Sequence, residues 1–294
     1  MAVNIKADKI VNSSDDEFSF FFTDLQEGQG LVFNAANNRW ENGVVSLADG
    51  RRGSLSSISE MNSLRFDGSS YLSRTPTTAG NRKTWTWSGW VKKSELTANR
   101  TTVFAAGNGN YYLAIEFDGT NKFRLVGTTT GNGSSLDGAV ASTQVFRDLN
   151  GWYHLMGVYS TTEATSTDRV SLYVNGVLME DTSTTIYPAL DRSSYINKAQ
   201  EHFLGGGWLN TSYKFKGYLA NIHFIDGQAL DANNFGETIS DVWVPKQYGS
   251  GDPSNAMAEY GTNGFHLDFA ASNMDFTNSK VLDASGRGNH WTLN

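Results

Sequence analysis

Short apolar stretches separated by glycine, asparagine and aspartate recur from residue 63 to about residue 230, and this pattern most restricts the fold. In residues 169–174, apolar side chains alternate with polar ones, and an alternation of period two places the apolar side chains on one face of a strand. Asn175-Gly176 follows directly and leads into a second apolar stretch. Because Asn-Gly between two such stretches is typical of a tight hairpin turn, the pattern predicts antiparallel β-structure.

The composition restricts the protein class further. The chain has 294 residues, of which 13% are aromatic, 18% are charged and 30 are glycine. Disordered chains carry few aromatic residues, and long solvated helices need more Lys, Glu, Ala and Leu. Several short strands with turns at this spacing therefore predict an all-β protein built as an antiparallel β-sandwich.

Charge and cysteine content exclude several functions. The net charge of −7 weighs against a nucleic-acid partner, because phosphate binding needs clustered Lys and Arg. The absence of cysteine excludes disulfides, thiolate catalysis and Cys-ligated metal sites. No apolar run approaches the ~20 residues of a membrane span, and residues 1–17 lack the apolar core of a signal peptide. We therefore expect neither nucleic-acid binding nor membrane insertion.

The tryptophans give the first expectations about the core. In the strand predicted at residues 83–93, Trp85 and Trp87 share one face, and Trp90 lies on the other face. Trp85, Trp87 and Trp152 alternate with polar residues, so they are assigned to the core.

The first 60 residues show no clear globular pattern. Four aromatic residues, Phe18, Phe20, Phe21 and Phe22, lie close together, and the pattern fits a strand or the start of a helix equally. So short a segment cannot bury them alone, so they pack either on the main domain or in a partner. Residues 30–43 predict a small hairpin, with strands at residues 31–33 and around Trp40.

Changes in the pattern along the chain suggest three segments. Residues 1–60 are predicted to be an extended N-terminal segment for attachment or oligomerisation, with Phe18, Phe20, Phe21 and Phe22 as its attachment residues. Residues 61–238 form the predicted sandwich. Residues 239–294 form a C-terminal extension that ends in a strand.

Six motifs follow one another in a characteristic order in the middle of the chain. They are Leu64-Arg-Phe-Asp-Gly-Ser-Ser-Tyr-Leu72, Trp85-Thr-Trp-Ser-Gly-Trp-Val91, Gly151-Trp-Tyr-His-Leu155, Val170-Ser-Leu-Tyr-Val-Asn-Gly-Val177, Phe203-Leu-Gly-Gly206 and Gly217-Tyr-Leu-Ala-Asn-Ile-His-Phe224. Together they resemble the laminin-G-like jelly roll of the concanavalin A-like lectins and glucanases. The resemblance implies a jelly-roll β-sandwich, and it extends to a last strand and short helix at residues 224–235.

The N-terminal flank resembles a different class of protein. Gln29, Phe33 and Trp40-Glu-Asn-Gly43 form a pattern similar to a short unit in tail-fibre and related virion proteins of bacteriophages, especially phages of marine cyanobacteria. The resemblance implies a virion structural protein, a tail-fibre or appendage subunit that docks to other virion proteins through residues 1–60. It would form homo-oligomers, most simply trimers, and present the sandwich to a host surface or glycan. The alternative is a stand-alone carbohydrate-binding module.

The end of the chain resembles the opening strand of such a jelly roll. The segment Asp283-Ala-Ser-Gly-Arg-Gly-Asn-His-Trp-Thr-Leu293 follows the Phe-Asp-Gly-Ser motif here, whereas the family has the strand before that motif. The strand closes this domain in a permuted order, inserts into a neighbouring subunit, or begins a second domain of a longer parent protein. The third interpretation is preferred.

The fold family includes glycan hydrolases, which need two carboxylates across a cleft. The jelly-roll glucanases carry Glu-x-Asp-x-x-Glu on one strand, and the nearest match here is Glu116-Phe-Asp118 with Asn121 in place of the second glutamate. Asp118-Gly119 also fits a hairpin turn. We therefore expect no catalytic residues and no enzymatic activity.

Metal and cofactor signatures are weak. The five histidines lie far apart, with none at the i, i+4 spacing of a zinc helix. Loop aspartates at positions 67, 118, 168 and 226 suit turns as well as calcium. No cofactor and no metal site is therefore predicted, and calcium is left as an alternative without named ligands.

Carbohydrate contact is the preferred binding hypothesis. Sugars bind to aromatic side chains that have amides and carboxylates beside them, and two loops offer such groups. The predicted glycan-contact residues are Asn110, Tyr111, Trp208, Asn210 and Tyr213.

Overall fold

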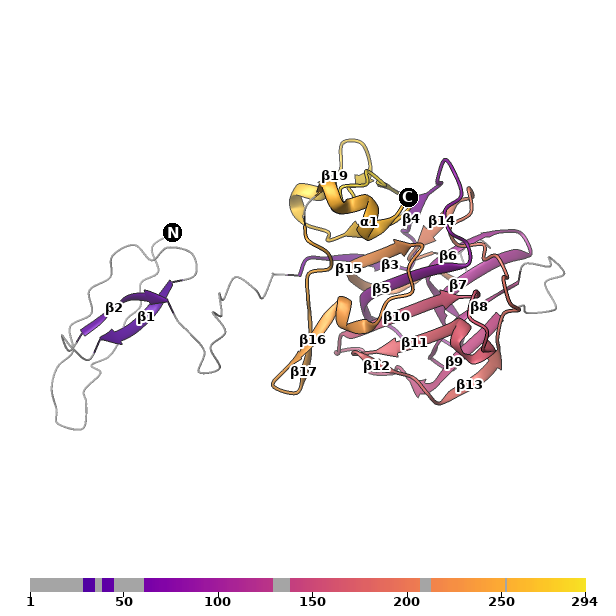
Figure 1. The fold of residues 1–294 in the computed structure, drawn as a ribbon, viewed down its shortest axis with the longest axis horizontal. Helices are drawn as coiled ribbons and strands as arrows, with labels where there is room; N and C mark the ends of the chain where they lie inside the picture. Colours follow the sequence, from indigo (N-terminus) through magenta and orange to yellow (C-terminus); the bar gives the residue numbers. More distant parts are fainter. Residues whose placement is uncertain (1–28, 35–38, 45–60, 129–137, 207–212, 252) are drawn as a thin grey trace. The chain divides into compact units, whose positions relative to one another are not determined.

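The structure is a computed structural model of the 294-residue chain. It describes all residues except 1–28, 35–38, 45–60, 129–137, 207–212 and 252 (Figure 1). The chain divides into two units, Met1–Glu60 and Met61–Asn294.

The described part of the first unit is the predicted hairpin. Strands β1 (Gln29–Asn34) and β2 (Arg39–Val44) pair antiparallel, with Phe33 opposite Trp40. The attachment residues Phe18, Phe20, Phe21 and Phe22 lie outside the described residues, so their role stays a prediction.

The second unit is built from two antiparallel sheets, which confirms the predicted sandwich (Figure 1). One sheet has seven strands in the order β12-β11-β10-β5-β15-β18, and β3 also pairs with β15. These strands are β3 (Ser63–Asp67), β5 (Thr84–Lys93), β10 (Tyr153–Ser160), β11 (Val170–Val174), β12 (Val177–Leu178), β15 (Lys216–Asp226) and β18 (Phe265–Leu267).

The other sheet has ten strands in the order β13-β9-β8-β7-β6-β14-β4-β21-β20-β19. These are β4 (Leu72–Arg74), β6 (Thr101–Asn108), β7 (Tyr111–Phe117), β8 (Lys122–Thr128), β9 (Gly138–Val145), β13 (Thr182–Ile186), β14 (His202–Leu204), β19 (Met274–Asp275), β20 (Lys280–Val281) and β21 (Trp291–Leu293). A separate hairpin joins β16 (Gly236–Ile239) to β17 (Val242–Pro245). The helices are short: η2 (Ser166–Arg169), η4 (Ala232–Asn234), η5 (Pro253–Asn255), α1 (Ala256–Tyr260) and η6 (Ala271–Asn273). Among the described residues, none of the helices has the length and apolar character needed to cross a bilayer.

Aromatic side chains fill the space between the sheets. Trp85 and Trp87 are fully buried, as the alternation predicts, and Trp85 stacks on Tyr159 with ring centroids 5.3 Å apart. Phe104 stacks on Trp87 from the opposite sheet. Trp152 is only partly buried and contacts Tyr218, so its assignment to the core is wrong. The reason is that Trp152 precedes the first residue of β10, so the alternation of side chains between the two faces of that strand does not include it.

The predicted Asn-Gly turn joins β11 to β12. Asn175 and Gly176 have φ angles of +48° and +82°, the left-handed values that a two-residue hairpin turn of this type requires. A Cβ atom on Gly176 would lie 2.5 Å from the Trp243 ring. Gly176 is therefore needed both for the turn and for the close approach of β17.

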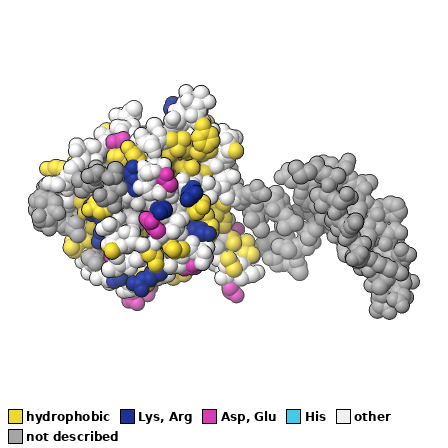
Figure 2. All heavy atoms as spheres, turned by 180° about the vertical axis from the view of Figure 1, so that it is seen from behind, with side chains coloured by type: hydrophobic (Ala, Val, Ile, Leu, Met, Phe, Trp, Pro, Cys, Tyr) yellow, Lys and Arg dark blue, Asp and Glu magenta, His cyan; other side chains and the backbone are white. Residues whose placement is uncertain are grey.

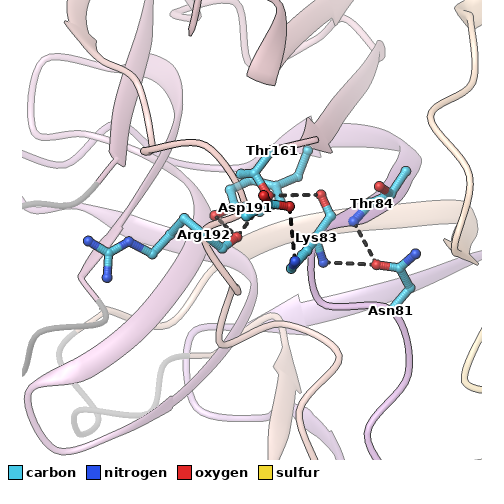
Figure 3. Close-up of polar contacts among 7 residues, drawn as sticks. Asn81, Lys83, Thr84, Thr161, Asp191 and Arg192 are labelled. Carbon is cyan, nitrogen blue, oxygen red and sulfur yellow. Dashed lines mark hydrogen bonds and ion pairs between the residues drawn. The ribbon is translucent and has the colours of Figure 1, made fainter. Parts of the chain in front are cut away.

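A long loop before β14 is held near the start of β5 by hydrogen bonds to main-chain carbonyls (Figure 3). Thr161 N–H donates to the Lys83 carbonyl, Asp191 N–H donates to the Thr161 carbonyl, and the Thr161 hydroxyl donates to the Arg192 carbonyl. The Lys83–Asp191 ion pair, 2.9 Å long, is solvent-exposed, and such pairs contribute only about 0–1 kcal/mol. The hydrogen bonds to the main-chain carbonyls therefore do most of the anchoring.

The C-terminal strand belongs to the same sandwich. β21 pairs antiparallel with both β20 and β4. Trp291 is 1% exposed, and its ring lies 5.0 Å from Phe265 and 6.3 Å from Phe104 between ring centroids. The structure thus shows the first of the three interpretations, closure in a permuted order. The preferred interpretation, a strand that begins another domain, is wrong for this segment, because β21 pairs with β4 of the same unit.

Residues 232–260 also cover the outer face of the seven-stranded sheet beside β10 and β15. Phe235 and Tyr260 pack with Met156, Val158 and Ile225, which point away from the main core. That face is therefore occupied by the chain itself, which directs attention to the outer face of the ten-stranded sheet.

Candidate functional site

The outer face of the ten-stranded sheet carries charged and aromatic side chains on its central strands. Along β7, residues Leu113, Ile115 and Phe117 belong to the main core. The alternate residues Tyr112 and Glu116 therefore point to the outer face. The outer-face site, as we define it, consists of Arg100, Thr102, Tyr112, Glu116, Arg124 and Tyr213.

Glu116 is a fully buried acid paired with an arginine on the neighbouring strand. In the ladder of β7 and β8, Glu116 lies directly opposite Arg124. Arg124 Nε and Nη2 donate to Glu116 Oε1 at 3.0 Å and 2.5 Å. Burial raises the pKa of Glu116, while Arg124 and Arg100 oppose that shift.

Two buried polar atoms at this site have no hydrogen-bond partner among the residues that the structure describes. Glu116 Oε2 is buried without a donor, and so is the hydroxyl of Thr102, which lies opposite Glu116 in the ladder of β6 and β7. An unpaired buried polar group costs about 1–3 kcal/mol. Such groups are uncommon in native proteins and are one mark of a site where a ligand or water completes the bonding.

Arg100 lies between two tyrosine rings. Its Cζ is 4.1 Å from the centroid of Tyr213 and 5.7 Å from that of Tyr112, so both contacts are within the range of cation–π interactions. Burial alone would lower the pKa of Arg100, but the Glu116 carboxylate raises it and the net shift is upward. The guanidinium thus links the aromatic rings to the buried acid.

The structure separates the predicted glycan-contact residues. Tyr213 lies in the outer-face site beside Arg100. Asn110 and Tyr111 lie at the hairpin between β6 and β7, where Tyr111 is 40% exposed and stacks on Tyr195 at 5.8 Å. Trp208 and Asn210 fall outside the described residues. Whether any of these residues contacts a glycan stays a prediction.

The sequence analysis missed Arg100, Thr102 and the pairing of Glu116. A signal for the pairing was present, because a turn at residues 118–121 places residue 116 opposite residue 124. No local signal indicates that Arg100 reaches Tyr213, since the two residues are far apart in the chain.

Asp118 and Asn121, which match part of the hydrolase motif, have two separate structural roles. Asp118 Oδ1 accepts hydrogen bonds from Thr120 N–H, the Thr120 hydroxyl and Lys122 N–H. Burial opposes the shift, but these bonds lower the pKa of Asp118. Asp118 is thus a turn residue, as predicted. Asn121 has φ of +68° and its Oδ1 accepts a hydrogen bond from the buried Lys93.

Lys93 is expected to make stability rise in mild alkali. It is 2% exposed, and burial lowers its pKa from 10.5 to about 8. The unfolded chain therefore binds more protons between about pH 8 and pH 10.5, so the free energy of unfolding should increase with pH across that window. Urea unfolding at several pH values measures this slope. Lys93→Met should flatten it, and an equal slope in both proteins would contradict the assignment.

Two of the other aspartates accept hydrogen bonds within the protein, and Asp226 is the last residue of β15 and not a loop residue as predicted. Asp67 accepts hydrogen bonds from Ser69 and Ser70, and Asp226 accepts from Asn81, Asn197 and Asn263. In the part of the chain that the structure describes, no three His, Cys, Asp or Glu side chains converge as metal ligands would. On the face seen in Figure 2, basic and acidic side chains lie among one another, so no field of one sign covers that face.

Comparison with known proteins identifies the family. The family model described as the concanavalin A-like lectin/glucanases superfamily matches residues 66–234. The chain belongs to this superfamily. The match takes in the outer-face site and ends at η4. No curated protein matches the chain.

One solved structure agrees with this chain in fold, and others are similar to parts of it. A putative carbohydrate-binding protein from Bacteroides ovatus is 15% identical over 80% of this chain and 58% of its own, with a TM-score of 0.52. The match therefore takes in little more than half of that protein. Domain 4 of an extracellular arabinanase from Geobacillus stearothermophilus, solved with arabinotriose, is 20% identical over 69% of this chain and 83% of that one, with a TM-score of 0.42. A pentraxin from Limulus polyphemus is 18% identical over 57% and 76%, with a TM-score of 0.38.

Proposed function

We propose that the sandwich binds a glycan at the outer-face site. The observation that carries the proposal is the unpartnered, buried Glu116 Oε2 beside an arginine stacked on Tyr213. A sugar offers hydroxyl groups, which donate to a carboxylate, and C–H faces, which pack on aromatic rings. The Bacteroides ovatus protein, described as a putative carbohydrate-binding protein, supports the proposal at the level of the fold.

The proposed role is binding without hydrolysis. A glycosidase needs a second carboxylate about 5–5.5 Å or 6.5–9.5 Å from the first. Asp118, the nearest acid in sequence, is held in its turn by three hydrogen bonds, and Asn121 occupies the position of the second glutamate. Incubation with polysaccharides should therefore release no reducing ends, and release that is lost in Glu116→Gln would contradict this role.

Substitutions at the outer-face site and at the β6–β7 hairpin test the location of binding. Once a glycan array has given a ligand, Tyr213→Ala is expected to weaken binding about tenfold, which is about 1.4 kcal/mol, because the ring that holds Arg100 is lost. Titration calorimetry measures the change. Tyr111→Ala is the matched control on the β6–β7 hairpin. Loss of binding in Tyr111→Ala with none in Tyr213→Ala would place the contact on the hairpin and contradict the outer-face proposal.

We further propose that the chain is a virion structural protein, a bacteriophage tail-fibre or appendage subunit located in the virion. The sequence pattern around residues 29–43 supports this, and those residues form a hairpin that alone would be marginally stable. Residues 1–60 would dock to other virion proteins, and the sandwich would face the host. Light scattering of the full chain should give three times the 32.2 kDa of one chain. A monomer would count against this role and favour the alternative, a stand-alone carbohydrate-binding module.

A further inference from the structure

A cavity lies within the C-terminal extension. It has a volume of about 270 Å³ and is lined by, among others, Tyr248, Glu259, Tyr260, His266, Asp268 and Ser285. We call it the C-terminal pocket. All of these residues follow residue 234, where the match to the superfamily ends, and His266 lies on β18 of the seven-stranded sheet.

Hydrogen bonds fix the protonation of the two histidines beside this pocket. His223 and His266 stack with ring centroids 4.1 Å apart, and the Nε2 of each ring lies near Asn221 Oδ1, at 3.2 Å and 2.7 Å. An amide oxygen only accepts hydrogen bonds, so both Nε2 atoms carry the hydrogen. His223 Nδ1 then accepts from the Tyr260 hydroxyl at 3.1 Å.

This arrangement leaves one ring nitrogen without a partner. When the His266 ring is neutral, Nδ1 has no hydrogen, and the described residues make no hydrogen bond to it. Because His266 lines the C-terminal pocket, the lone pair of Nδ1 is the polar group that the ring offers to a ligand. Burial lowers the pKa of His266, although Asp268 and Asp283 oppose the shift. The ring is therefore neutral, and its lone pair is available, at neutral pH.

Two carboxylates of the pocket are held in place by hydrogen bonds. Glu259 Oε1 accepts from Ser250 N–H at 2.7 Å. Asp268 accepts from Ala270 N–H and from the Asn273 side chain. The Tyr248 hydroxyl donates to the Glu259 carbonyl at 2.7 Å, which fixes the orientation of its ring in the wall.

The chemistry of the pocket selects among ligands. Two carboxylates repel anions, and the His, Asp and Glu side chains described here do not converge as a metal site requires. Acceptors beside a tyrosine ring suit a molecule with several hydroxyl groups and an apolar face. The volume lies just below the usual range for ligand pockets, about 300–1,000 Å³, so it suits a single ring.

We propose that the C-terminal pocket is a second binding site, which takes one neutral sugar ring and in which His266 Nδ1 accepts a hydrogen bond from a sugar hydroxyl. This site is separate from the outer-face site and stands on its own observations.

Histidine NMR on the full chain tests the proposal. With ¹⁵N-labelled histidine, the probes are the methyl glycosides of glucose, galactose, mannose and N-acetylglucosamine, followed by calcium chloride and inorganic phosphate. We expect a saturable shift of His266 Nδ1 with at least one glycoside. His202 is the internal control, because both of its nitrogens are already hydrogen-bonded. A response to calcium or phosphate alone, or to no probe, would overturn the proposal.

Two variants distinguish this site from the first. Glu259→Gln should weaken the glycoside response at least fivefold, because a carboxylate accepts hydroxyl hydrogens better than an amide does. Tyr213→Ala should leave the response unchanged. If Tyr213→Ala removes it and Glu259→Gln does not, the sugar binds at the outer-face site and the C-terminal pocket is not a binding site.

Discussion

Trp291→Ala is expected to lower the free energy of unfolding by about 3–5 kcal/mol, the usual cost of removing a large buried aromatic side chain. Trp291 is 1% exposed and contacts Phe104 and Phe265, so its loss leaves a cavity between the sheets. Urea unfolding followed by far-UV circular dichroism measures the change without depending on tryptophan fluorescence.

Phe276→Ala is the matched control for this prediction. Phe276 lies in the same C-terminal extension but is 74% exposed, so its removal should change stability by no more than about 0.5 kcal/mol. Equal effects in the two variants would mean that β21 does not complete the sandwich in solution.

The second large effect is expected from Arg124→Met. The substitution leaves Glu116 buried with only Arg100 to compensate its charge, and removal of one partner of a buried pair costs about 3–5 kcal/mol. Because Arg100 remains nearby, we expect a value near the lower end of that range at neutral pH. Chemical denaturation gives the number.

The pH dependence and a double variant identify the cause. Burial raises the pKa of Glu116 in the folded protein, so the unpaired acid is destabilising when ionised, and the deficit of Arg124→Met should shrink as pH falls and the acid is protonated. Adding Glu116→Gln should restore part of the loss. A deficit that does not change with pH and is not reduced in the double variant would show that Arg124 acts through packing alone.

Local sequence patterns predicted the parts of the fold that depend on local physics. The alternation of apolar residues gave the strands and the buried faces of Trp85 and Trp87. The Asn175-Gly176 turn and the turn role of Asp118 followed from backbone preferences. Each of these depends on residues within a few positions of one another, where side-chain period and φ angles decide the outcome.

Long-range pairing could not be predicted in the same way. Nothing near Trp291 in the sequence indicates that its strand pairs with β4. Whether the strand pairs within this domain or with another domain depends on which sheet has an unpaired edge strand. The contacts of the outer-face site could be predicted from local sequence only in part, for the same reason. Glu116 and Arg124 face each other across a short turn, but the contact of Arg100 with Tyr213 needs the whole sheet to be formed.

The pairing of β21 with β4 has a consequence for how the protein is made. Asn294 bonds to Ser73, 221 residues earlier in the chain, and contacts of such long sequence separation slow folding. During translation, one edge of β4 stays unpaired until almost all of the second unit has left the ribosome. An unpaired strand edge can pair with another chain and cause aggregation. The yield of native protein should therefore depend on a low concentration of nascent chains or on chaperones that shield that edge.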